Sequence, residues 1–84
     1  FMETIKEVWS GILEDLHNQD DISEVAYNVW ITCIEPLSIE DGEVVVYVHT
    51  DFQKKIVTDH YAAKFREAFE MVMGIPLGLR IRSG

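Results

Sequence analysis

Hydrophobic residues recur along the chain with two spacings, one typical of helices and one typical of strands. In the first third of the chain they follow helical spacing in two separate segments, which predicts two amphipathic helices. The first helix is expected to span Ile5–His17, behind a capping box made by Thr4 and Glu7. The second is expected to start after Ser23 as its N-cap and to end just before Pro36, which disfavours helical backbone in the preceding residue.

The middle of the chain has the pattern of a strand. Glu43–Val48 is rich in β-branched and aromatic residues. Both of its faces are largely apolar, so we expect a central strand that is covered on both sides. Leu37–Ile39 is a shorter alternating segment, and the turn residues Glu40–Gly42 are expected to join the two strands as a hairpin. Leu77–Arg82 alternates between apolar and polar residues and predicts a third strand.

The longest helix is expected between the second and third strands, from Asp51 to about Met73. Thr50 and Gln53 form a second capping box at its start, and Gly74 suits the left-handed residue that ends many helices. Apolar residues at helical spacing predict the side that this helix buries: Phe52, Ile56, Val57, Tyr61, Phe65, Phe69 and Val72.

The order of these elements, α-α-β-β-α-β, predicts an α+β fold with three helices and a three-stranded sheet. We expect residues 1–84 to form a single domain, with residues 1–3 as an N-terminal extension and Phe1 as an addition to the natural chain. KH-type nucleic-acid-binding domains share this order, but they hold the phosphate backbone with a G-x-x-G loop that the sequence lacks. The prediction is therefore a KH-like topology without the KH loop. Its core is expected to include Leu13, Tyr27, Trp30, Val46 and Phe65.

The chain is acidic, and its charges are unevenly distributed. Its 84 residues carry a net charge of −8 at pH 7, and most of the 15 acidic side chains lie in residues 1–43. An acidic surface repels phosphate groups, so strong nucleic-acid binding by this chain alone is not expected. The asymmetry suits protein partners or contacts between copies of the chain, and it equally suits ordinary solubilising charge.

Composition also bears on the cellular compartment. Cys33 is the single cysteine, so an internal disulfide is excluded and a reducing compartment, the cytoplasm, is expected. No apolar run approaches the roughly 20 residues that a membrane-spanning helix needs. The start of the sequence does not resemble a signal peptide, so we expect neither secretion nor a membrane partner.

Candidate catalytic and metal-binding residues are sparse. His17, His49 and His60 fall on different predicted elements without a cysteine partner, so no metal site is expected. Cys33 lies on the apolar second helix, which favours a buried and unreactive thiol. The sequence has no G-x-x-x-x-G-K-[ST] phosphate-binding loop. We therefore expect a domain that is not an enzyme, that holds no metal or cofactor, and that acts as an interaction module.

Four short motifs, taken together in order and spacing, carry a resemblance to a known family. Trp9–Leu13 is similar to a W-x-x-x-L opening of the first helix, and Tyr27–Ile31 is similar to an aromatic-x-x-W-[IM] motif in the second. Tyr47–Phe52 resembles a strand that ends in A-P-N-x-F, and Asp59–Tyr61 resembles a helix-three signature around a tyrosine. These motifs resemble the N-terminal domain (domain I) of the bacterial replication initiator DnaA.

The sequence also departs from the family pattern at several positions. His49 and Thr50 replace the Pro-Asn pair, although Thr50 keeps the capping ability of asparagine. Ile56 stands where a tryptophan is common in the third helix, and Ala26 replaces an acidic residue that some members carry. These departures indicate a divergent member or a stand-alone relative.

The resemblance implies a cytoplasmic protein-interaction module that mediates self-association of the initiator and contacts the replicative helicase and initiation regulators. The alternative is a stand-alone regulatory adaptor that uses the same fold to bind another protein. Trp9 is either a core residue or part of a self-association face that supports a weak homodimer. Phe52 matches the family phenylalanine associated with helicase contact, although its spacing also fits the core. Lys54 and Lys55 beside it would form a cationic rim that orients an acidic partner.

Overall fold

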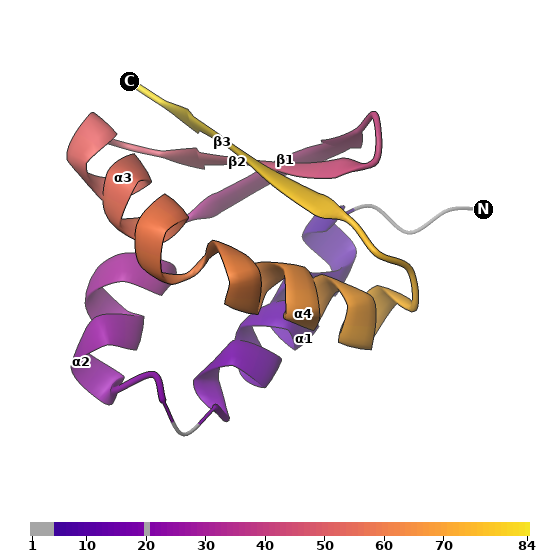
Figure 1. Ribbon diagram of the computed structural model, residues 1–84, viewed down its shortest axis with the longest axis horizontal. Helices are drawn as coiled ribbons and strands as arrows, with labels where there is room; N and C mark the ends of the chain where they lie inside the picture. Colours follow the sequence, from indigo (N-terminus) through magenta and orange to yellow (C-terminus); the bar gives the residue numbers. More distant parts are fainter. Residues whose placement is uncertain (1–4, 20) are drawn as a thin grey trace.

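The computed structural model describes residues 5–19 and 21–84, so the predicted capping role of Thr4 lies outside the described residues. It confirms the predicted α+β class: a mixed three-stranded sheet lies above a layer of helices (Figure 1). None of the described helices combines the length and hydrophobicity needed to cross a lipid bilayer. The elements are α1 Ile5–His17, α2 Glu24–Ala26, the π-helical η1 Tyr27–Ile31, β1 Glu35–Glu40, β2 Glu43–Val48, α3 Asp51–His60, α4 Ala62–Met73 and β3 Gly78–Ser83.

The sheet has the order β1-β2-β3, which confirms β2 as the central strand. β1 pairs with β2 in antiparallel fashion, through a hairpin in which Asp41 and Gly42 both have positive φ angles, of 52° and 76°. These angles suit the tight turn that matches the twist of two adjacent strands. β1 is longer than predicted because it starts before Pro36, and the register shifts between Pro36 and Ser38 as in a β-bulge. β3 runs parallel to β2.

The prediction that β2 is covered on both faces is wrong. Val44, Val46 and Val48 face the helices and are fully buried in the core. The helices lie on that side of the sheet alone (Figure 1). Val45 points to the other face, yet its exposed fraction is 1%. It lies on the central strand, with Ser38 and Arg80 as its cross-strand neighbours. The apolar residue at this position therefore reflects its central place in the sheet and not a second layer.

The second helix is shorter than predicted and is partly π-helical. The N-cap is confirmed, since the Ala26 N–H donates to Ser23 Oγ at 3.1 Å. The helix ends after η1, where the Thr32 N–H donates to the carbonyl of Tyr27 at 3.1 Å. A π-turn adds one residue per turn and so rotates the side chains that follow. Tyr27 and Ile31 are buried, whereas Trp30 is only half-buried, contrary to the prediction that it belongs to the core.

The predicted single helix over residues 51–73 is wrong, because the chain forms two helices, α3 and α4, and the described elements therefore include more than the three helices expected. They meet at Tyr61, whose φ and ψ angles are −125° and −8°. α3 packs against β2, β3 and η1, whereas α4 packs mainly against α1 and also contacts β3. Figure 1 shows the change of direction between the two helices. One straight helix could not follow both surfaces. The predicted left-handed end at Gly74 is confirmed by its φ angle of 78°.

The break also changes which residues the two helices bury. In α3 the buried residues are Gln53 and Val57, and Phe52 at the head of the predicted stripe is exposed. In α4 Phe65 and Phe69 are buried as predicted, and Val72 is exposed. The core therefore confirms most of the expected members, including Tyr27, Val46 and Phe65, whereas Leu13 is only partly buried at its margin.

Candidate protein-interaction surface

Two aromatic side chains meet at the surface where η1 packs against the first turn of α3. The rings of Trp30 and Phe52 are arranged edge to face, with their centroids 5.8 Å apart. The exposed fraction of Phe52 is 65%, which is unusual for a phenylalanine in a folded domain. Val25 and Val29, one turn apart on the α2–η1 helix, are also exposed. We call these four residues the Trp30–Phe52 surface.

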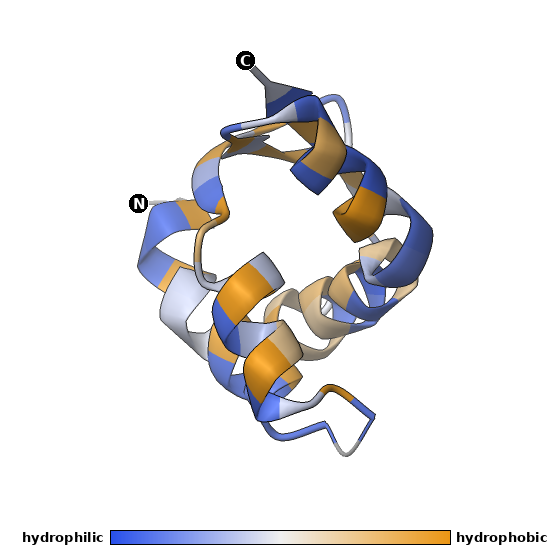
Figure 2. Ribbon diagram, turned by 90° about the vertical axis from the view of Figure 1, so that its left-hand side faces the viewer, coloured by the Kyte–Doolittle hydropathy of each residue, from blue (hydrophilic) through white to orange (hydrophobic). Residues whose placement is uncertain are grey.

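Figure 2 is turned towards this side of the molecule and shows hydrophobic segments of the α2–η1 helix in the foreground. An exposed apolar surface of this kind is unfavourable for an isolated domain, and such patches mark places where proteins bind partners. Sequence reasoning missed Val25 and Val29, although a signal was present. Both are large apolar residues that lie off the predicted buried stripe of the second helix.

The start of α3 is fixed by a network of hydrogen bonds around Gln53. Its backbone N–H donates to Thr50 Oγ1 at 3.1 Å, and its side-chain oxygen accepts from the His49 N–H at 3.3 Å. The first bond confirms Thr50 as the predicted N-cap, whereas the reciprocal bond of a capping box is displaced by one residue, because the Gln53 side chain bonds His49 and not Thr50. The Gln53 side-chain amide also donates to the sulfur of Cys33, in the turn that follows η1. The backbone on either side of the aromatic pair is therefore tied together, and the pair is held in place before any partner binds.

Lys54 and Lys55 lie on α3 beside Phe52, and both are exposed. Residues three apart share one side of a helix, so Lys55 lies next to Phe52, whereas Lys54 points to a different side. Lys55 pairs with Asp59, with 3.0 Å between Nζ and Oδ2. The structure thus brings Lys55 to the rim of the Trp30–Phe52 surface, partly neutralised, and separates Lys54 from it.

Trp9 lies elsewhere in the fold. Its exposed fraction is 8%, and its ring stacks on Phe65 with a centroid distance of 5.9 Å and an interplanar angle of 14°. Trp9 therefore belongs to the core between α1 and α4, and the structure does not bring it together with Phe52. Only the small exposed part of the Trp9 ring could contact another molecule.

The ionisable side chains of the described residues do not gather into a reactive cluster. No group of three or more His, Cys, Asp and Glu side chains in residues 5–19 and 21–84 is placed to hold a metal ion. The pKa of Tyr27 is raised by burial and by the nearby Glu24 carboxylate, while its hydroxyl donates to the carbonyl of Leu13 at 3.4 Å. This hydroxyl therefore acts as a structural donor that joins the second helix to α1.

Comparison with known proteins decides the family. Residues 6–71 match the family described as the DnaA N-terminal domain. This chain belongs to that family. It is 35% identical over 65 residues to the chromosomal replication initiator protein DnaA of Thermus thermophilus, a match that covers 77% of this chain and 14% of the relative. The DnaA protein of Chlorobaculum tepidum is 28% identical over 69 residues, which cover 82% of this chain and 14% of that protein.

The fold agrees with this assignment. The solved structure of a HobA–DnaA (domain I–II) complex from Helicobacter pylori contains a chain that superposes with a TM-score of 0.76 at 14% identity. The superposition covers 92% of this chain and 98% of that one. At such low identity the likeness establishes the fold and nothing more. The chain corresponds to a small part of the DnaA relatives, namely their N-terminal domain.

Proposed function

We propose that this chain is the protein-interaction module of a bacterial replication initiator, and that it binds the replicative helicase and initiation regulators through the Trp30–Phe52 surface. Membership of the DnaA N-terminal domain family supports the link to initiation. The structural neighbour from Helicobacter pylori, described as a complex with HobA, supports a role in binding proteins. The observation that carries the proposal is the exposed aromatic pair of Trp30 and Phe52.

This pair has the properties of an interaction hot spot. Aromatic side chains contribute a large share of the binding energy in protein interfaces, and tryptophan is among the most enriched. A ring that is already held in position loses little conformational entropy on binding. The Gln53 network fixes the helix start that carries Phe52, and the contact with Trp30 restricts the Phe52 ring itself. Lys55 at the rim would orient an acidic partner and contribute less to affinity, because exposed ion pairs are weak.

Alanine substitution of Phe52, compared with that of Met71, tests the proposal. Both side chains are large, apolar and exposed, but Met71 lies near the end of α4 and outside the Trp30–Phe52 surface. We expect Phe52→Ala to weaken binding of the replicative helicase from the same organism by about 2 kcal/mol or more. Met71→Ala is expected to bind like the wild type, and neither change should lower the melting temperature greatly. If Phe52→Ala binds normally, or if it binds poorly only because it is unfolded, the assigned surface is incorrect.

We propose self-association as a second, weaker activity of this module. The sequence left open whether Trp9 is a core residue or part of the contact. Because Trp9 is largely buried, the proposed contact uses α1 and the exposed edge of the Trp9 ring. Sedimentation over a concentration series measures this activity. Association that persists in a folded Trp9→Phe variant but is lost in a folded Trp9→Ala variant would support a contact through the ring. A wild-type chain that stays monomeric at high concentration would exclude it.

The proposed role is non-catalytic and cytoplasmic. A stand-alone regulatory adaptor would use the same surface, and Phe52→Ala would then weaken binding to the adaptor's own partner. The gene sequence distinguishes the initiator from the adaptor. An ATPase domain and a helix-turn-helix domain encoded downstream in the same reading frame would identify the initiator. A reading frame without them would favour the adaptor.

A further inference from the structure

The two edges of the sheet differ in how well they are protected against pairing with another chain. β1 contains Pro36 and a bulge, and it carries glutamates at both ends, Glu35 and Glu40. Proline, bulges and charge are the usual means by which edge strands avoid adding a further strand. β3 has neither a proline nor a bulge between Gly78 and Ser83, and its charged residues, Arg80 and Arg82, are both positive and alternate with apolar ones. Its edge is therefore the one that is open to strand addition.

The backbone of β3 offers hydrogen-bonding groups along this edge. The Gly78 N–H donates to the carbonyl of Gly42 at 3.0 Å, so the polar groups of Gly78 are directed towards the β2 side. Because these groups alternate in direction along a strand, the N–H and C=O groups of Leu79, Ile81 and Ser83 are directed away from β2. Among the described residues, no backbone hydrogen bond joins these groups to another element.

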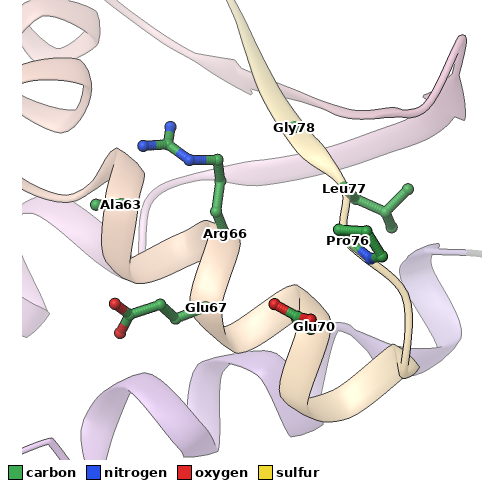
Figure 3. A pocket seen from close by; sticks show the side chains of 7 residues that line it. All are labelled: Ala63, Arg66, Glu67, Glu70, Pro76, Leu77 and Gly78. Carbon is green, nitrogen blue, oxygen red and sulfur yellow. The ribbon is translucent and has the colours of Figure 1, made fainter.

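A pocket lies beside the beginning of this edge. It has a volume of about 460 Å³ and lies between α4 and the segment that leads into β3. Figure 3 shows Arg66 extending from α4 towards the sheet, with Pro76 and Leu77 on the opposite side. The lining residues are Ala63, Arg66, Glu67, Glu70, Pro76, Leu77 and Gly78. A groove between an edge strand and a helix is the setting in which several domain families bind extended peptides.

Charge indicates what kind of segment fits this edge. Arg80 and Arg82 are exposed and pair in register with Val45 and Tyr47, on the face of the sheet away from the helices. Arg80 binds Glu43, with 2.7 Å between Nη2 and Oε1, whereas Arg82 takes part in none of the ion pairs found among the described residues. The same edge of a second copy would place arginines near arginines, which is unfavourable. An acidic segment would instead complement Arg82.

We propose that the β3 edge binds an extended peptide segment with alternating acidic and apolar residues, which adds to the sheet as a further strand. Its backbone pairs with Leu79, Ile81 and Ser83. Its apolar side chains face the apolar part of the pocket beside α4, formed by Ala63, Pro76 and Leu77. Its acidic side chains lie on the outer face near Arg82. This site uses other residues than the Trp30–Phe52 surface, although its far end lies close to the start of α3, where the Ser83 hydroxyl donates to Asp51.

An octapeptide of alternating glutamate and valine, blocked at both ends, is the probe for this site. Added to the isotope-labelled chain, it should shift the amide resonances of Leu79, Ile81 and Ser83 and slow their hydrogen exchange. A peptide of alternating glutamate and proline has the same charge but cannot form a continuous strand, and it should produce neither effect. Equal effects from the two peptides would show simple charge attraction and would overturn the proposal. Shifts confined to the Trp30–Phe52 surface would overturn it as well.

Charge reversal at Arg82 gives a second, independent test. Arg82→Glu should weaken binding of the glutamate–valine peptide about fivefold, since one favourable exposed pair is replaced by a repulsive one. Lys6→Glu makes the same change in net charge on α1, which packs against β1 and α4, and it should leave the affinity unchanged. A lysine–valine peptide should bind Arg82→Glu better than the wild type. Equal losses in the two variants, or β3 resonances that respond to a single-stranded oligothymidine and to neither peptide, would contradict strand addition.

Discussion

Removing the Trp9 side chain should destabilise the fold more than most single substitutions in this chain. The ring is 8% exposed and stacks on Phe65, which is itself fully buried between α1 and α4. Trp9→Ala would leave a cavity next to Phe65, and core changes from a large aromatic residue to alanine cost about 3–5 kcal/mol. A chain of this length has a total stability of roughly 4–12 kcal/mol, at ~0.05–0.15 kcal/mol per residue.

The expected loss of stability in Trp9→Ala is therefore a large part of the total stability, and it corresponds to a fall in melting temperature of roughly 12–40 °C. Urea denaturation measures it directly, with the fluorescence of Trp30, the remaining tryptophan, as the reporter. Trp9→Phe is the matched control, because it keeps an aromatic ring against Phe65, and it should cost about 1–2 kcal/mol. A loss below about 1 kcal/mol for Trp9→Ala would show that the ring is not part of the core and would refute the reasoning.

Three further substitutions test the local structure. Gly74→Ala should cost about 1 kcal/mol in urea denaturation, because the φ angle of 78° is unfavourable for a residue with a side chain. Gln53→Ala should cost about 1–2 kcal/mol, and it should increase the exchange rates of amides in the first turn of α3, because the Gln53 side chain accepts from the His49 N–H and donates to Cys33. The hydrogen bond from Lys64 lowers the pKa of Asp21 below 3.8, so this pair stabilises the fold above that pH and loses its effect as the pH falls through the lowered pKa. Asp21→Asn should accordingly be less stable than the wild type at pH 7, and the two should converge in strong acid; an unchanged difference would exclude the pair.

Local sequence signals were sufficient for the elements that depend on local chemistry. The bounds of β2 follow from its β-branched residues, and the start of α3 follows from Thr50 and Gln53, whose predicted hydrogen bond the structure confirms. The left-handed conformation of Gly74, which ends α4, also follows from a local signal, the glycine itself. In each case the deciding interaction joins residues that are close in the sequence.

The remaining features depend on packing between distant parts of the chain. The break at Tyr61 coincides with no glycine or proline. It arises because α3 packs against the sheet and η1, whereas α4 packs mainly against α1. That break places Gln53 in the interior and leaves Phe52 at the surface, which helical spacing over residues 51–73 could not predict. The π-turn at η1 similarly brings Trp30 to the margin of the core, next to Phe52. The candidate site is thus created by two irregularities that the sequence pattern did not reveal.

Resonance mapping of a partner complex tests most directly whether this module binds proteins through the Trp30–Phe52 surface. The isotope-labelled chain would be titrated with the replicative helicase of the same organism, and amide shifts or broadening would be recorded along the chain. We expect the changes to concentrate in residues 25–33 and 50–55, and to leave the end of α4, around Met71, unaffected. Changes centred on α4, or no changes at concentrations where the helicase binds the full initiator, would contradict the proposed surface.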